Sequence, residues 1–209
     1  MTDSSARAGE AARRMPSVEE FDAMYAETPP WDIGRPQPAF VRLAEMGDLR
    51  GRTLDVGCGT GEHALMAAGL GLTATGVDAA PIAIGIARRK AEERKLEARF
   101  IVADALDLAA LGDDFDIVLD CGLFHVFNDD DRARYVASLH DIVVHGGTYY
   151  MLCFSDRQPG DWGPRRVSQA EIRSAFAHGW HVASIDPVTI DITISPEGVQ
   201  AWLSKIVRS

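Results

Sequence analysis

The chain alternates between two patterns of hydrophobic and polar positions. Short apolar runs end at a glycine or an aspartate, and each is followed by a segment whose apolar residues recur at helical spacing. The pattern predicts strands at residues 53–56, 73–77, 98–102, 115–119 and 148–154, and helices at 61–70, 81–94 and from 129 to the glycine pair 146–147. Strands that alternate with helices are typical of an α/β domain with a mostly parallel sheet.

The residues before the first strand follow a different pattern. Ser17-Val18-Glu19-Glu20 has the form of a capping box and predicts a helix, which Pro29-Pro30 ends, and a second short helix is expected at 38–46. Residues 1–15 are polar and rich in Ala, Arg and Ser, so we expect a disordered tail there. Residues 16–209 are expected to form a single domain, with an N-terminal helical lid segment at 16–50 and a core at 51–209.

The C-terminal part begins with a long loop rich in Pro and Gly, 155–167, and a helix that Ser168 starts with another capping box. A strand is expected from Trp180 to Ile185, with an extension toward Ile194. The last element, 201–207, has two interpretations: a short helix capped near Ser195-Pro196, or the second strand of a hairpin. The architecture favours the strand.

Composition and charge narrow the function classes. The chain has 209 residues, enough for one well-buried core, and 46% of them are hydrophobic. Its net charge of −10 disfavours a nucleic-acid-binding surface, which presents clustered Lys and Arg. The 3 cysteines are dispersed and no apolar run approaches the roughly 20 residues of a membrane span. We therefore expect a cytoplasmic protein without a metal ion that acts on a small molecule.

The motif that indicates chemistry is the turn after the first strand, Leu54-Asp55-Val56-Gly57-Cys58-Gly59-Thr60-Gly61. Glycines in such a turn let a ligand approach the backbone closely. A dinucleotide fingerprint would place its third glycine one position later, where this chain has Glu62. Asp55 would repel a pyrophosphate but attract an ammonium or a sulfonium. The turn therefore predicts a nucleotide-like ligand that is cationic at one end.

Two more carboxylates follow the next two strands. Asp78 ends the second strand and is placed to accept hydrogen bonds from ribose hydroxyls, and Asp104 after the third strand is placed to accept from an adenine amine. Because the carboxyl ends of parallel strands meet at one edge, we expect Asp55, Asp78 and Asp104 to line one crevice. For each acid alone, capping of a strand end is the alternative. Their order after the glycine turn favours a ligand site.

This constellation resembles the class I S-adenosylmethionine (SAM)-dependent methyltransferases from about Trp31 to the C-terminus. The resemblance implies a doubly wound, Rossmann-like sheet of seven strands, mostly parallel, with one antiparallel C-terminal strand and helices on both faces. It implies SAM as cofactor and S-adenosylhomocysteine as its product. The contacts to SAM that it implies run from the methionine end to the adenine: Asp55, Gly57, Cys58, Gly59, Gly61, Asp78, Asp104 and Ala105, with Ala79 and Ile82 against the adenosine.

The segment Trp31-Asp32-Ile33-Gly34-Arg35-Pro36-Gln37 resembles one found in the thiol, thiopurine and heterocyclic-toxin subgroup of small-molecule methyltransferases. The resemblance implies that this segment folds over SAM as a lid, with Trp31 near the methionine part. An indole face beside a sulfonium is also a favourable cation–π contact. The alternative is that Trp31 anchors the N-terminal arm to the core.

Candidate residues for the methyl acceptor come from the lid and from the ends of the fourth and fifth strands. By the resemblance, Cys121 and Gly122 border the methyl group through their backbones. Histidine titrates in the range of a general base near pH 7, so His125 is either a base or a hydrogen-bonded structural residue. The side chains expected around the acceptor are Tyr25, Trp31, Phe124, His125, Phe127, Phe154 and Trp162.

The aromatic side chains in this set favour a flat, apolar acceptor. We expect O- or N-methylation of a hydroxyquinolone, a quinol or a toxin-like heterocycle, with thiol S-methylation as the alternative. The subgroup resembled is the mycobacterial heterocyclic-toxin and benzoquinone methyltransferases. We expect a role in detoxification and a monomer or homodimer. In-line displacement mainly requires alignment and exclusion of water, so neither a catalytic triad nor a metal cluster is needed.

Three other functions remain as alternatives. Glu62 and Asp55 disfavour a nicotinamide oxidoreductase. The acidic charge, and the lack of an Asn/Asp-Pro-Pro-aromatic motif after the fourth strand, disfavour a nucleic-acid methyltransferase. A SAM-binding protein without catalysis stays open.

Overall fold

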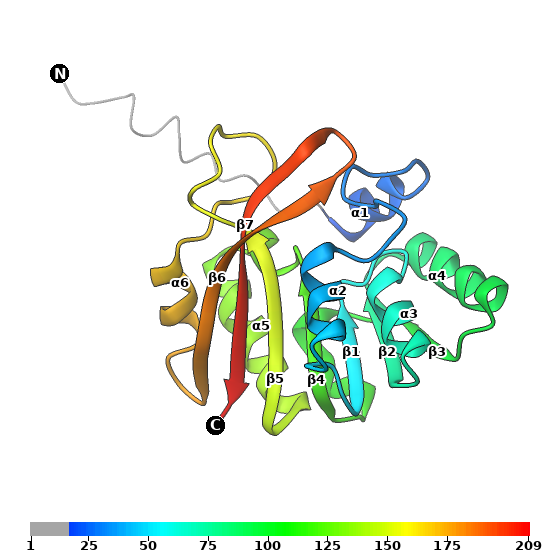
Figure 1. Cartoon of the computed structure of the whole chain (residues 1–209), viewed down its shortest axis with the longest axis horizontal. Coiled ribbons are helices and arrows are strands. Elements are labelled where there is room, and N and C mark those ends of the chain that lie inside the picture. The colour runs from blue at the N-terminus through cyan, green and yellow to red at the C-terminus, as the bar shows by residue number, and fades with distance from the viewer. Residues whose placement is uncertain (1–16) are drawn as a thin grey trace.

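A computed structural model describes residues 17–209, and the tail expected at residues 1–15 lies outside the described residues. The described chain contains a seven-stranded sheet in the order β3-β2-β1-β4-β5-β7-β6 (Figure 1). In this sheet β7 runs in the direction opposite to the other strands, antiparallel to both β5 and β6, as predicted. The strands are β1 (Arg52–Val56), β2 (Thr73–Asp78), β3 (Ala98–Val102), β4 (Phe115–Cys121), β5 (Val143–Phe154), β6 (Trp180–Ile192) and β7 (Ser195–Arg208).

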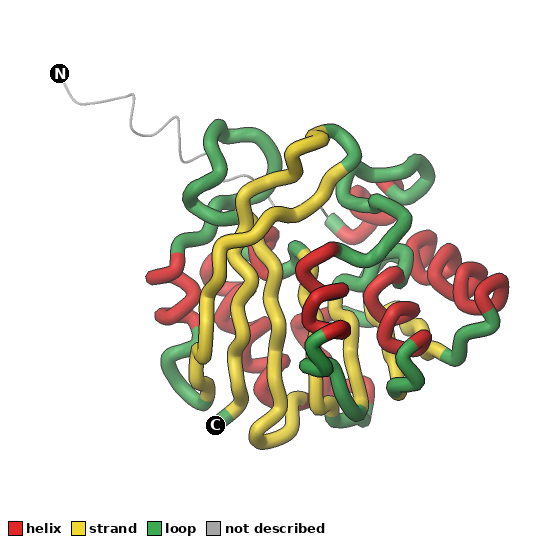
Figure 2. Tube along the Cα trace, viewed as in Figure 1, coloured by secondary structure: helices red, strands yellow, loops and turns green. Residues whose placement is uncertain are grey.

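Helices cover both faces of the sheet, which confirms the predicted doubly wound fold (Figures 1 and 2). Figure 1 shows α2, α3 and α4 on one face, and α5 and α6 on the other, with α1 above the carboxyl ends of the parallel strands. No described helix is long and apolar enough to cross a membrane. The helices are α1 (Val18–Met24), α2 (Pro38–Glu45), α3 (Glu62–Gly69), α4 (Pro81–Arg94), α5 (Asp129–Ile142) and α6 (Gln169–Ala175), with the short 3-10 helices η1 (Ala105–Leu111) and η2 (Phe124–Val126).

The central strands are buried on both faces. Successive residues of a strand point to opposite sides, so Tyr149 and Met151 of β5 pack in the larger core cluster with residues of α5 and α6. Tyr150 and Leu152 pack on the other side, in a cluster that includes Phe40 of α2. These two apolar layers hold the strands, and therefore the turns that follow their carboxyl ends, in fixed positions.

The boundary between α5 and β5 differs from the sequence prediction, and the last element decides between its two interpretations. Helix α5 ends at Ile142 and β5 begins at Val143, well before the glycine pair that was expected to end the helix. Val143 is fully buried and pairs with Phe115 of β4, and β-branched residues favour extended backbone. At the C-terminus, Ser195-Pro196 begins β7 and caps no helix, so the predicted hairpin strand is confirmed.

The turn between β1 and α3 is pressed against the next β-α unit. Gly61, the N-cap residue of α3, has a φ of +87°. A Cβ at this position would lie 2.7 Å from the ring of Phe100 and 2.9 Å from the Cβ of Ala87. Both the backbone conformation and the space therefore require glycine.

A pair of alanine variants separates these two requirements. Gly71 has a similar φ of +78° but open space around it, so Gly71→Ala introduces only backbone strain of about 1 kcal/mol. Gly61→Ala should add overpacking of about 1–3 kcal/mol against Phe100 and Ala87. Urea unfolding of both variants measures the difference. Equal losses would show that conformation alone selects glycine at position 61.

Candidate functional site

The predicted residues that follow β1 and β2 lie together at the carboxyl edge of the sheet. The N–H of Gly59 donates to Oδ2 of Asp78 (2.8 Å), and the N–H of Ala80 donates to Oδ1 (2.9 Å). Burial raises the pKa of Asp78 and the charge of Asp55 adds to the rise, although the N–H donors oppose it. Asp78 therefore fixes the glycine turn, and a carboxylate with two bound donors still has lone pairs for a ligand.

Asp55 contributes a buried oxygen atom without a partner. Its side chain is 1% exposed, and Oδ2 accepts a hydrogen bond from the N–H of Ala64 in α3 (3.1 Å). Oδ1 has no hydrogen-bond partner among the described residues, and Nδ1 of His63 lies 3.6 Å from it. An unsatisfied buried carboxylate oxygen is costly. A ligand ammonium, directly or through water, would satisfy it.

The residues expected around adenosine form a more open part of the same edge. Asp104 is exposed, and its Oδ1 caps η1 by accepting from the N–H of Leu106 (2.9 Å). The loop after β3 is joined to β2 because the N–H of Ala103 donates to the carbonyl of Asp78 (3.1 Å). Capping, the alternative role of Asp104, is thus present in the structure. Three further predicted contacts are half-buried or exposed at this edge: Ala79, Ile82 and Ala105.

Tyr25 reaches the glycine turn from the N-terminal segment. Its ring packs with Ala80 and Ala83 at the start of α4, and its hydroxyl lies 2.7 Å from where a Cβ on Gly59 would be. Nε1 of Trp31 donates to this hydroxyl (3.0 Å), and the Trp31 side chain is 41% exposed. Burial raises the pKa of Tyr25. Tyr25 was expected at the acceptor, but the structure places it over the glycine turn.

The N-terminal segment is tied to two distant parts of the chain. Oγ1 of Thr60 in the glycine turn donates to Asp32 (2.9 Å). The side-chain amide of Gln37 donates to the carbonyl of Asp191 in β6 (2.9 Å) and accepts from its N–H (2.8 Å), while the N–H of Gln37 donates to Nε2 of His63 (3.2 Å). The segment therefore bridges the glycine turn and the β6–β7 hairpin, which rises above the carboxyl edge in Figure 1.

The turn after β4 is shaped by Asp120, which sequence reasoning did not single out. Its buried carboxylate accepts from the N–H of Leu123 (2.8 Å) and from the hydroxyls of Tyr135 (2.9 Å) and Tyr149 (2.6 Å). Burial raises the pKa of Asp120 to about 6, and these hydrogen bonds oppose the rise. Leu123 in turn lies 3.1 Å from where a Cβ on Gly57 would be. In the sequence, the signal for Asp120 is its place near the end of a strand. Its partners Tyr135 and Tyr149 lie 15 and 29 positions further along the chain, so the sequence does not show the contacts.

His125 lies beside Gly122, but its geometry does not support a general base. Its Nδ1 accepts from the N–H of Phe154 (3.0 Å), so the neutral ring carries its proton on Nε2, the atom nearest to Gly122. Burial lowers the pKa of His125 to about 3, and the charges of Arg132 and Arg166 add to this. Neither nitrogen is available to take a proton near pH 7. Of the two predicted roles, the structure favours the hydrogen-bonded structural residue.

Two residues expected around the acceptor lie in the core instead. Phe124 is fully buried and stacks on Phe176 (5.8 Å between ring centroids). Phe127 is 5% exposed and packs against Tyr135 (4.9 Å). Both belong to the larger core cluster, so the expectation that they form the acceptor wall is corrected. Aromatic residues after a strand suit a core and a pocket equally well in sequence, and the residues on other elements that each one packs against decide between them.

Phe154, Trp162 and Arg166 form a cluster at the loop after β5. The Phe154 and Trp162 rings meet edge-to-face, with 6.0 Å between centroids, and the guanidinium of Arg166 lies 5.3 Å from the ring of Phe154 and 5.7 Å from that of Trp162. Arg166 also donates to the carbonyls of Pro164 (2.7 Å) and Trp162 (2.9 Å), which holds the loop after β5. Phe154 is 5% exposed, belongs to the core cluster that includes Phe40, and meets His125 edge-on at 4.9 Å. The cluster therefore runs from the buried Phe154 beside the β4 turn outward to Trp162, which is 42% exposed.

The cysteines of the site are neutral thiols. Burial raises the pKa of Cys58 and Cys121, and the charge of Asp55 adds to the rise in both. Neither is therefore placed to act as a nucleophile near pH 7. Within residues 17–209, no group of three or more His, Cys, Asp or Glu side chains could hold a metal ion.

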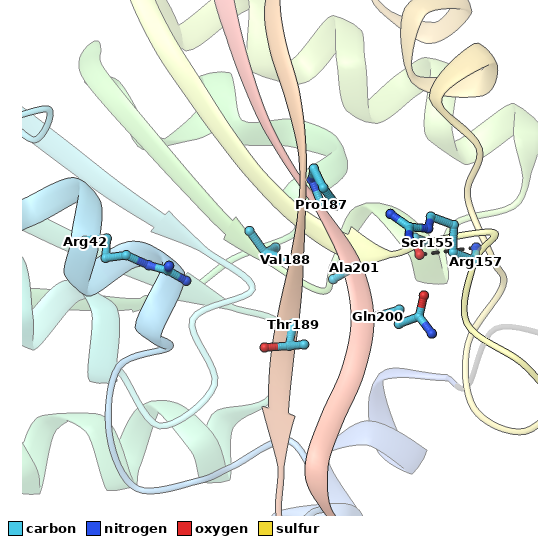
Figure 3. A pocket seen from close by; sticks show the side chains of 8 residues that line it. All are labelled: Arg42, Ser155, Arg157, Pro187, Val188, Thr189, Gln200 and Ala201. Atoms are coloured by element: carbon cyan, nitrogen blue, oxygen red, sulfur yellow. Dashed lines mark hydrogen bonds between the residues drawn. The ribbon is translucent and has the colours of Figure 1, made fainter.

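An open hollow of about 500 Å³ lies along β6 and β7, beside α2 (Figure 3). Arg42 of α2 and Arg157 of the loop after β5 border it, together with Thr189 and Gln200. The N–H of Arg157 donates to Oγ of Ser155 (3.2 Å) at its rim. None of the predicted site residues lines this hollow, so it is not the predicted donor site.

Known proteins similar to this chain are methyltransferases. A family model described as a methyltransferase domain matches residues 53–147. The 2-heptyl-1-hydroxyquinolin-4(1H)-one methyltransferase of Mycobacteroides abscessus is 37% identical over 174 residues, which are 82% of this chain and 77% of that protein. A solved structure is similar to this chain with a TM-score of 0.84 at 39% identity, and the match covers 92% of this chain and 93% of the other. Its description is the conversion of a disulfide bond into a thioacetal group during echinomycin biosynthesis.

The chain belongs to the SAM-dependent methyltransferases. A magnesium protoporphyrin IX methyltransferase from Synechocystis with bound SAM shares the fold, with a TM-score of 0.65 at 21% identity over 82% of this chain and 76% of the other.

SAM is the methyl donor of this methyltransferase, and the residues at the carboxyl edge fit it. Oδ1 of Asp55 is a buried acceptor without a partner, as the ammonium or a bridging water of a methionine moiety requires. Leu123 and Tyr25 pack closely on this turn, where a Cβ on Gly57 or Gly59 would meet them. The edge thus combines an unsatisfied carboxylate with a glycine turn that Leu123 and Tyr25 enclose.

His125 should lower the stability of the methyltransferase in mild acid because it stays neutral in the fold. Its pKa is about 3 in the native state and near 6.5 in the unfolded state, so below pH 6.5 only the unfolded state binds the proton. This residue should therefore cost about 1.4 kcal/mol of unfolding free energy between pH 7.5 and 5.5. Urea unfolding at both pH values should show this extra loss in the wild type and not in His125→Asn, whose amide oxygen can still accept from Phe154.

Proposed function

We propose that this methyltransferase methylates an oxygen or nitrogen atom of a small aromatic or heterocyclic compound, such as a hydroxyquinolone, a quinol or a toxin-like compound. The observation that carries the proposal is the cluster of Phe154, Arg166 and Trp162, in which the Trp162 ring is partly exposed. A flat acceptor can stack on the exposed Trp162 ring with its reacting atom toward the turn at Gly122. The Mycobacteroides relative, whose name states a hydroxyquinolone acceptor, supports the same class.

The donor would lie along the carboxyl edge. In this proposal Asp55 and the turn from Gly57 to Gly61 take the methionine end, Asp78 takes the ribose hydroxyls, and Asp104 and Ala105 take the adenine. When bound, SAM supplies a methyl group activated on a sulfonium. The hydrogen bonds that Asp78 already makes support its role, because they fix the carboxylate before a ligand arrives.

The N-terminal segment would act as the lid. Trp31 and Tyr25 cover the glycine turn, and the bond from Thr60 to Asp32 holds the segment against it. A closed lid excludes water and aligns the reacting atoms, which can account for about 7–11 kcal/mol of the barrier to a displacement. Cys121 and Gly122 would border the methyl group through their backbones.

We expect the chain to provide no general base. His125 presents an N–H toward Gly122, and Asp120 is engaged by the hydroxyls of Tyr135 and Tyr149. The acceptor would therefore react as an anion formed before the transfer, which suits acidic hydroxyl groups. The net charge of −10 also supports a small molecule as acceptor rather than a nucleic acid.

A thiol is the second candidate acceptor. The solved structure at 39% identity is described under the conversion of a disulfide bond into a thioacetal group, which is sulfur chemistry. A thiolate forms near neutral pH and also needs no protein base. An aromatic thiol would stack on the exposed Trp162 ring in the same way as a hydroxylated heterocycle.

Transfer of a radiolabelled methyl group from SAM to a panel of quinols, hydroxyquinolones, azoles and thiols tests the proposal. Label on hydroxylated heterocycles, at rates that follow the ionised fraction of each acceptor, would support it. Trp162→Ala should raise the KM of such an acceptor about tenfold, the loss expected for one aromatic stacking contact. The dissociation constant of SAM should stay unchanged, and Met46→Ala, at an exposed position after α2, is the control. Label on thiols alone would favour the second candidate.

Asp78 should be required for donor binding. Asp78→Asn removes the charge and one of the acceptors available to the ribose hydroxyls, so the dissociation constant of SAM should rise at least about tenfold. Calorimetry with SAM measures this, and Asp107→Asn, an exposed carboxylate on η1, serves as the matched control. An unchanged affinity would remove Asp78 from the ribose role.

A further inference from the structure

His63 lies between the N-terminal segment and the donor carboxylate, a position that sequence reasoning missed. It is the second residue of α3 and is 9% exposed. One face of its ring meets Phe40 of α2 edge-on, with 4.9 Å between the ring centroids. Its two nitrogens face different structures: Nε2 meets the N–H of Gln37 (3.2 Å), and Nδ1 lies 3.6 Å from Oδ1 of Asp55.

The hydrogen bond from Gln37 decides where the proton of His63 lies. Because Nε2 accepts from the N–H of Gln37, the neutral ring carries its proton on Nδ1. Nδ1 lies 3.6 Å from Oδ1 of Asp55, the oxygen atom that has no hydrogen-bond partner among the described residues. The ring is rigid, so a rotation that shortens the contact to Asp55 also moves the atom that holds Gln37.

Gln37 is also the anchor of the N-terminal segment. It is 2% exposed, it precedes α2 as the N-cap residue, and its side chain forms two hydrogen bonds with Asp191 of the β6–β7 hairpin. The segment that it ends carries Trp31 and Asp32, which contact Tyr25 and Thr60. A displacement at Gln37 is therefore transmitted to the residues over the glycine turn.

We propose that His63 is a positioning residue that couples occupation of the donor site to the placement of the N-terminal segment. Its Nδ1–H orients the free oxygen of Asp55 toward the donor, and its Nε2 holds the segment through Gln37. Binding at Asp55 then stabilises the closed segment, and by linkage the closed segment strengthens donor binding. This inference rests on the assignment of Asp55 to the donor site, and it is independent of the acceptor.

Two isosteric variants separate the two contacts of His63. In His63→Asn the side-chain amide nitrogen replaces Nδ1 and keeps a donor for Asp55, but the acceptor for Gln37 is lost. In His63→Gln the amide oxygen replaces Nε2 and keeps the acceptor, but the donor toward Asp55 is lost. His140→Gln is the matched control, because His140 lies on α5 and packs against Trp180. Calorimetry with SAM alone gives the affinity, and hydrogen exchange of the peptide 30–41 reports on the segment.

In the wild type, SAM should slow exchange in the peptide 30–41. His63→Gln should weaken SAM binding about tenfold, as for one hydrogen bond to a charged group, and leave exchange in the free protein unchanged. His63→Asn should exchange faster in this peptide, with little protection by SAM, and by linkage its affinity for SAM should fall by no more than the factor by which SAM slows exchange in the wild type. His140→Gln should change neither.

Parallel losses of both properties in the two variants, or no loss in either, would overturn the coupling and leave His63 as a packing residue. If the wild type bound SAM but gained no protection at residues 30–41, the coupling would fail while the donor site stood. If the wild type bound no SAM, the donor site itself would be refuted, and this inference with it.

Discussion

The contact of the glycine turn with the second β-α unit is the constraint on which the rest of the site depends. Gly61 meets Phe100 and Ala87 with no room for a side chain, and this sets where α3 begins. At that position Asp55 can cap α3, and Gly59 can donate to Asp78. The polar edge is therefore a consequence of packing. A turn that stood further from β2 would leave Asp78 without the donor from Gly59.

The same turn also anchors the segments around it. Thr60 donates to Asp32 and accepts from Lys90 of α4 (2.7 Å), so one hydroxyl joins the lid segment to a helix. Glu62 binds Lys90 and Arg94, each at 2.8 Å. Burial raises the pKa of Glu62, but the hydrogen bonds from these two cations lower it overall. The residue that argues against a dinucleotide fingerprint in the sequence thus holds α4 against the turn.

The fold and the donor edge could be predicted because both depend on local patterns. Each strand, the turn after it and the acid at its end are contiguous, as Asp55 and Asp78 illustrate. The acceptor side could not be predicted to the same extent. Phe124 and Phe154 pack in different core clusters, against residues that lie on other elements. Gln37 and Asp191, which are joined by hydrogen bonds, lie 154 positions apart in the sequence. Hydrophobic periodicity carries no information about such pairings.

In the proposed reaction, the charges on the two sides of the β4 turn match a sulfonium and an anionic acceptor. Toward the glycine turn, burial raises the pKa of Cys121, and the charges of Asp55 and Asp120 add to the rise. Toward Phe154, burial lowers the pKa of His125, and the charges of Arg132 and Arg166 add to this. The carboxylates would therefore attract a cationic donor and the guanidinium groups an anionic acceptor, each to its own side. Transfer of the methyl group would neutralise both charges, so neither product would be held as strongly as its precursor, which would favour release after the reaction.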